Sequence, residues 1–159
     1  MIAKGRIEMV SGSNLAYAYH EETGKSEVRR ELARALPEPF NYGYVPGTIC
    51  QDGEELDIFI LSSRKFHIGD IVEARPIGVI LMEDEGGVDN KIIAVDAAEN
   101  AYSRVTQAGE VRALVDLITY YVQHNKDGIP GKFVNIKGLG DAGDAEMVLK
   151  GAAKNKRTL

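Results

Sequence analysis

Several features that mark other protein classes are missing from this sequence. Its 159 residues include one cysteine, Cys50, so a disulfide cannot form within the chain, and a small disulfide-stapled scaffold is excluded. The longest uncharged apolar stretch, 76–82, is far shorter than the roughly 20 residues of a membrane-spanning helix. No apolar segment of signal-peptide type follows the first six residues. These absences predict a cytoplasmic protein that does not cross a membrane.

The charge balance argues against a nucleic-acid-binding protein. The chain has 24 acidic and 19 basic residues, a net charge of -5, whereas nonspecific binding to nucleic acid depends on basic contacts to phosphates. The composition is 44% apolar and 27% charged, which is typical of a globular domain. At this length we expect one domain over residues 1–159, which buries roughly 70% of the surface that the unfolded chain exposes. The histidines His20, His67 and His124 show no zinc-ligand spacing.

The first 110 residues have the pattern of short strands. Runs of β-branched and aromatic residues alternate with polar ones and are separated by turns rich in glycine and aspartate. The turn Asp84-Glu85-Gly86-Gly87 is expected to join two strands as a hairpin. The expected strands cover residues 2–10, 15–19, 27–32, 42–49, 56–61, 71–82 and 91–95.

After Glu110 the apolar spacing changes to intervals of three and four residues, which predicts an amphipathic helix of about four turns. The residues with this spacing are Val111, Leu114, Val115, Ile118, Tyr121 and Val122. The helix should stop at 127–130, where glycine and proline follow it, and a strand at 132–136 and a helix at 141–154 complete the chain. We therefore predict the α+β class: mainly β with two helices, as a small closed OB-like β-barrel with peripheral helices.

Two acidic turns carry the clearest chemical signal. The segment 52–57 has four carboxylates in six residues, and the segment 84–91 has three more and ends in Lys91. Like charges that converge repel one another unless a divalent cation neutralises them. Carboxylate oxygens without histidine or cysteine suit Mg²⁺ rather than zinc or copper. Each turn alone is also consistent with a solvated acidic loop, but their pairing favours a metal site.

Phosphate chemistry at such a metal would also need cations around the remaining oxygens. Arg30, Lys91 and Lys126 are the candidates, although each by itself is more typical of a surface charge. The motif Asn41-Tyr42-Gly43-Tyr44 adds two phenols, for which packing in the core and a hydroxyl directed at a ligand both stay open.

The motifs and their order along the chain resemble those of the soluble inorganic pyrophosphatases of the Mg²⁺-dependent OB-barrel type. The family signature is Asp-Gly-Asp-Pro-hydrophobe-Asp, and the chain has Asp52-Gly53-Glu54-Glu55-Leu56-Asp57, which fits at four of six positions. The resemblance extends from Glu8 to about Lys137. Its other matching positions are Asn41-Tyr42-Gly43-Tyr44, Arg75-Pro76-Ile77-Gly78-Val79, Asp84, Asp89, Lys91 and Lys126.

The resemblance implies a set of metal ligands. Asp52, Asp57 and Asp89 would bind the activating metal, and Asp84 would help to hold a further ion. Glu8 matches an acidic position at the edge of the family's site. The implied cofactor is Mg²⁺, with Mn²⁺ as the alternative.

The resemblance also implies the groups that act on the substrate. Arg30, Tyr42, Lys91 and Lys126 would hold phosphate oxygens, and Glu54 would accept a proton from the metal-activated water. Lys91 joins Glu54 as a catalytic residue, because a cation stabilises the charge on the departing phosphate.

The chain departs from the family pattern at several of these positions. Ala16-Tyr17-Ala18 stands where the family has Lys-x-Glu, and Pro37-Glu38-Pro39 where it has aromatic-Tyr-Pro. Asn125 replaces the tyrosine before Lys126, and Glu54 is one methylene longer than the usual aspartate. These changes affect substrate contacts more than contacts to the first metal.

The function that the resemblance implies is Mg²⁺-dependent hydrolysis of inorganic pyrophosphate to two phosphates. Two alternatives stay open because of Ala16, Ala18 and Asn125. One is a degenerate relative that binds a phosphorylated ligand or a protein partner without turnover. The other is a hydrolase of a different diphosphate. The family resemblance also implies a homo-oligomer, a hexamer in the bacterial type.

Overall fold

The structure of the protein is a computed structural model that describes residues 1–31 and 40–157, the last four as backbone. No helix in these residues is long and apolar enough to cross a membrane. The elements in chain order are β1 (Ala3–Met9), β2 (Leu15–His20), β3 (Lys25–Glu31), β4 (Asn41–Val45), β5 (Leu56–Leu61), β6 (Ile71–Asp84), β7 (Gly87–Val88), β8 (Lys91–Asp96), two 3-10 turns (Asn100–Tyr102 and Ala108–Val111), α1 (Arg112–His124), β9 (Val134–Gly140) and α2 (Ala142–Arg157).

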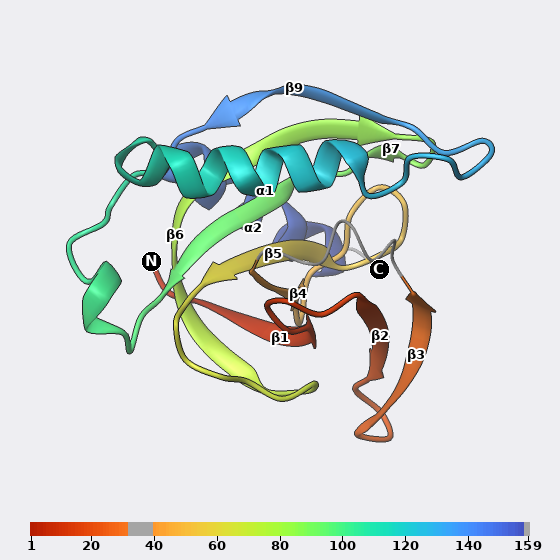
Figure 1. Ribbon diagram of the computed structural model, residues 1–159, viewed down its shortest axis with the longest axis horizontal. Helices are drawn as coiled ribbons and strands as arrows, with labels where there is room; N and C mark the ends of the chain where they lie inside the picture. The colour runs from red at the N-terminus through yellow and green to blue at the C-terminus, as the bar shows by residue number, and fades with distance from the viewer. Residues whose placement is uncertain (32–39, 158–159) are drawn as a thin grey trace.

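Five strands close into a ring. β1 pairs with β4, β4 with β5, β5 with β8, β8 with β6, and β6 returns to pair with β1. All these pairs are antiparallel except β5–β8, which is parallel. Closure depends on the 14-residue β6, which pairs with β1 at its start and with β9 at its end. The small closed barrel and the mainly β class with peripheral helices are therefore confirmed (Figure 1).

The core lies on both faces of the sheet. Phe59 and Leu61 of β5 pack in a cluster with α1, whereas Ile58 and Ile60 pack in a second cluster with α2. β5 is buried on both faces, which explains why its sequence is an unbroken apolar run. In Figure 1 α1 lies across one side of the barrel, and its buried residues follow the predicted spacing.

The structure corrects the bounds of two predicted strands and the second strand of the predicted hairpin. The strand expected at 42–49 ends at Val45, because Pro46 lacks an N–H and Gly47 turns the chain with a φ of 87°. The strand expected at 132–136 lies at Val134–Gly140, where it can pair with β6. The expected hairpin exists, but its second strand is the two-residue β7, which pairs with Glu83 and Asp84.

The hairpin of β2 and β3 forms a separate two-stranded sheet beside the barrel (Figure 1). The guanidinium of Arg6 on β1 donates to both carboxylate oxygens of Glu21, at 2.8 and 2.7 Å. The Tyr44 hydroxyl donates to the same carboxylate at 2.7 Å. The Tyr19 N–H donates to the Glu8 carboxylate at 2.7 Å. These polar contacts hold the hairpin against one end of the barrel.

Gly43 is required where β4 approaches β1 most closely. A Cβ atom at this position would lie 1.7 Å from the backbone oxygen of Arg6, and neither strand can move aside without breaking the pairing. We expect Gly43→Ala to lower the free energy of unfolding by about 3 kcal/mol or more. Gly138→Ala is the matched control, since a Cβ there meets no atom within 4 Å. Urea unfolding measures both, and equal small losses would contradict the argument.

Candidate active site

A cleft of about 760 Å³ opens between the barrel, the β2–β3 hairpin and the segment after α1. The residues that the sequence singled out come from separate elements, and all ten line this cleft. They are Glu8, Arg30, Tyr42, Asp52, Glu54, Asp57, Asp84, Asp89, Lys91 and Lys126. The two acidic turns therefore do converge, as expected from their pairing in the sequence.

The first acidic turn is shaped by its own backbone contacts. Gly53 has a φ of 85°, which favours glycine, and the Glu54 N–H donates to the Asp52 carboxylate at 3.0 Å. The Cys50 N–H donates to the Glu54 carbonyl oxygen at 2.7 Å and closes the loop. The chain then enters β5, where Leu56 is buried and Asp57 lines the cleft.

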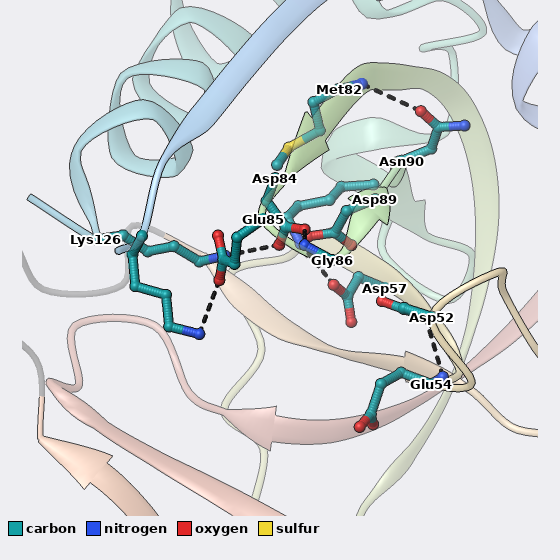
Figure 2. Close-up of polar contacts among 12 residues, drawn as sticks. Asp52, Glu54, Asp57, Met82, Asp84, Glu85, Gly86, Asp89, Asn90 and Lys126 are labelled. Carbon is teal, nitrogen blue, oxygen red and sulfur yellow. Dashed lines mark hydrogen bonds and ion pairs between the residues drawn. The ribbon is translucent and has the colours of Figure 1, made fainter. Parts of the chain in front are cut away.

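The second acidic turn meets the first because β5 and β8 are neighbouring parallel strands. Their register places Asp57 directly beside Lys91. The hairpin of β6 and β7 precedes this point, and the Asp84 carboxylate accepts the Gly86 N–H at 2.8 Å. The Asp89 N–H donates to the Met82 carbonyl oxygen at 3.0 Å. Figure 2 shows the aspartates of both turns gathered in one region.

Lys91 is the buried cation at the centre of this group. Its side chain is 9% exposed, and its Nζ lies 2.5 Å from Asp57 Oδ2 and 3.2 Å from Asp89 Oδ2. Burial by itself would lower the pKa of Lys91, but the two carboxylates outweigh it and hold that pKa well above its usual value. Burial raises the pKa of Asp89 to about 6, with the Asp57 charge adding to the rise and Lys91 opposing it.

A second lysine of the cleft, Lys126, also binds carboxylates. Lys126 Nζ is 2.7 Å from Asp84 Oδ2 and 3.4 Å from Glu85 Oε1 (Figure 2). Burial alone would raise the pKa of Asp84, but Lys126 and the Gly86 N–H hold it below its usual value. Lys132 lies 2.8 Å from Glu85 and lowers the pKa of that carboxyl to about 2.

Tyr42 and Glu8 lie on the barrel wall of the cleft. The Tyr42 ring packs against Phe59 with centroids 4.9 Å apart, and its hydroxyl interacts with Asp57. The ring of this phenol packs in the core, and a role of its hydroxyl toward a ligand stays a prediction. Burial raises its pKa, and the Asp57 charge adds to the rise. Burial also raises the pKa of Glu8 to about 7, against the opposing hydrogen bond from the Tyr19 N–H.

The donor set of the cleft fits a hard divalent cation, because it is rich in carboxylates, and burial raises the pKa of two of them, Glu8 and Asp89. In the part of the chain that the structure describes, no three acidic, histidine or cysteine side chains already form a ligand cluster. The Lys91 ammonium instead bridges Asp57 and Asp89. The Glu54 carboxylate points away from the aspartates (Figure 2).

Comparison with known proteins identifies the family. The family described as inorganic pyrophosphatase matches residues 6–157. An inorganic pyrophosphatase of Sulfolobus acidocaldarius is 36% identical over 151 residues, which cover 93% of this chain and 87% of the relative. This chain belongs to the inorganic pyrophosphatase family. The prediction of a pyrophosphate-hydrolysing enzyme, an inorganic diphosphatase, is thereby confirmed.

Solved structures of the pyrophosphatase family share the fold. An inorganic pyrophosphatase of Helicobacter pylori superposes with a TM-score of 0.91 at 35% identity and covers 97% of this chain and 92% of that one. A structure described as an inorganic phosphatase of Anaplasma phagocytophilum gives a TM-score of 0.93 at 29% identity, with 98% and 94% covered.

The departures from the pyrophosphatase pattern occupy different places. Ala16 is buried and packs in the core cluster beneath α1, whereas Ala18 lines the cleft. Asn125 also lines the cleft, and its Oδ1 is buried without a hydrogen-bond partner in residues 1–31 and 40–153. Glu38 lies outside the described residues.

Sequence reasoning missed several residues that line the pyrophosphatase cleft. Glu85 binds Lys126 and Lys132, and its position beside Asp84 in the acidic turn was the available signal. Glu22, which reads as part of an ordinary surface turn, lies at the cleft because the hairpin folds over it. Arg29 also lines the cleft, although Arg30 follows it directly in the sequence.

Proposed function

We propose that the cleft binds Mg²⁺, or alternatively Mn²⁺, and hydrolyses inorganic pyrophosphate to two phosphates. The observation that carries this proposal is the convergence of the two acidic turns on Lys91 within one cleft. Family membership supports the same reaction. The placement of Arg30 and Lys126 in that cleft supplies the positive charge that a diphosphate requires.

Five carboxylates would hold the metal ions. Asp52, Asp57 and Asp89 are proposed for the activating ion, and Asp84 and Glu8 for further ions. A bound divalent ion makes a coordinated water more acidic and polarises phosphoryl oxygens. The raised pKa of Asp89 supports this role, since burial is its main cause and the like charge of Asp57 adds to it.

The remaining residues would act on the substrate. Arg30, Tyr42, Lys91 and Lys126 would hold phosphate oxygens, and Glu54 would take the proton of the attacking water. The new bond forms between that water oxygen and one phosphorus atom while the bridging P–O bond breaks. Lys91 would stabilise the charge that develops on the departing phosphate.

A phosphate-release assay across a panel of diphosphates, with Mg²⁺ and with Mn²⁺, tests the proposed function. Fastest release from pyrophosphate supports it. Faster release from a nucleotide or sugar diphosphate would instead identify a hydrolase of another diphosphate. Background rates for every substrate and both metals would identify a non-catalytic relative.

Removing the metal should lower the thermal stability of the protein. Burial raises the pKa of Asp89 although Lys91 lies beside it, and Asp57 adds a like charge, so a divalent cation should stabilise the folded site. Metal at one hundred times its dissociation constant should add about 2.7 kcal/mol, or roughly 5 to 10 °C in melting temperature. Calorimetry with EDTA and with excess Mg²⁺ measures the shift. Equal melting temperatures would remove the metal site from the proposal.

The assembly and location of the protein remain predictions. We expect a homo-oligomer, a hexamer by family resemblance, in the cytoplasm. Light scattering after size-exclusion chromatography measures the mass of the assembly against the 17.4 kDa of one chain.

A further inference from the structure

The cations of the cleft differ in what they already bind. Lys91 is bound to Asp57 and Asp89, and Lys126 is bound to Asp84. Lys132 is bound to Glu85. The side chains of Arg29 and Arg30, in contrast, form no ion pair or hydrogen bond within the described part of the chain. The two arginines of β3 are therefore the cations that are open to an incoming anion.

A bulge in the β2–β3 hairpin explains why the successive residues Arg29 and Arg30 line the same cleft. Neighbouring side chains of a regular strand point to opposite faces. Here Ala16 pairs with Arg30 and Tyr17 pairs with Val28, so the register leaves Arg29 as an extra residue. A bulge of this kind re-aims a side chain. Arg29 and Arg30 both line the cleft as a result.

The opposite strand of the hairpin, β2, brings no lysine or arginine to the cleft. Its contribution to the cleft wall includes the small Ala18, and Ala16, which pairs with Arg30, is buried. Arg29 is close enough to the acidic wall that its charge lowers the pKa of Glu8, against the larger effect of burial. Arg29 is thus exposed to solvent and lines the same cleft as Glu8.

We propose that Arg29 is a phosphate-binding residue, which together with Arg30 forms a two-arginine site for a terminal phosphate group of a diphosphate. The planar guanidinium groups match phosphate oxygens through paired N–H donors. This inference rests on the proposed function, because it assigns Arg29 to the same substrate. The inference adds Arg29 to Arg30 as a second arginine that binds phosphate on the hairpin side of the cleft.

The test measures binding of imidodiphosphate, a diphosphate analogue with a P–N–P bridge, by titration calorimetry with and without Mg²⁺. We expect Arg29→Gln to weaken its affinity roughly tenfold, and Arg29→Lys to recover part of the loss. Lys25→Gln is the control, since Lys25 is an exposed cation on the same strand that does not line the cleft. It should bind the analogue as the parent does.

Steady-state kinetics separates this inference from the proposed function. An increase in KM for pyrophosphate in Arg29→Gln, larger than the change in kcat, supports substrate binding by Arg29. Equal affinities of Arg29→Gln and the parent for imidodiphosphate would overturn the inference, and so would a parent that does not bind the analogue. A parent that binds it but releases no phosphate from pyrophosphate would refute the proposed function alone.

Discussion

Replacing Asp57 with asparagine is expected to abolish pyrophosphate hydrolysis. The amide keeps one oxygen but loses the charge that a divalent cation requires. Loss of an outer-shell partner of a metal ligand costs roughly 10- to 100-fold in metal affinity or activity, so loss of a direct ligand should cost more than about 100-fold. Asp57 lies at the start of β5 and also contacts Lys91 at 2.5 Å, so the same change leaves that buried ammonium with Asp89 alone.

Two further variants make this prediction specific. Asp89→Asn should lose activity to a similar extent, because Asp89 is the second carboxylate beside Lys91. Asp116→Asn should leave activity unchanged, since Asp116 is exposed on α1, where it binds Arg112. Phosphate release and a Mg²⁺ titration measure both effects, with circular dichroism as the check on folding. A parental metal affinity in Asp57→Asn would show that Asp57 is not a ligand.

The second large effect is expected at Glu54. As the proposed general base, it should support hydrolysis by roughly 10²- to 10⁴-fold, the usual range for general acid–base catalysis. Glu54→Gln should therefore reduce turnover by this factor. Its backbone is held by hydrogen bonds to Asp52 and Cys50, but its carboxylate points away from the aspartates in Figure 2. To act as the base, the side chain would have to rotate toward the aspartates that would hold the metal.

The Glu54→Asp variant shows how well the longer side chain is placed. If Glu54 is a poorly aligned base, shortening it should raise turnover of pyrophosphate. If the turn around Gly53 suits the longer side chain, Glu54→Asp should lower turnover instead. Glu146→Gln, an exposed carboxylate on α2 that binds Lys150, is the control. Equal rates for the parent and both Glu54 variants, measured at saturating Mg²⁺, would exclude Glu54 as the base.

The positions of most elements could be predicted because the information for them is local. β5 is apolar on both faces, and α1 repeats its buried residues every three or four positions, so each pattern identifies its own element. The turn at 52–57 is likewise closed by contacts within a few residues. The order of the motifs along the chain was enough to point to the pyrophosphatase family, which the comparisons show.

The geometry of the cleft depends on contacts between distant residues, which local patterns do not contain. The parallel pairing of β5 with β8 sets Asp57 beside Lys91, 34 positions along the chain. The folding of the β2–β3 hairpin against the barrel brings Glu22 to the cleft. Arg29 is the clearest case. In a regular strand the side chains of Arg29 and Arg30 would point to opposite faces. Only the bulge in the pairing of β2 with β3 directs both side chains into one cleft.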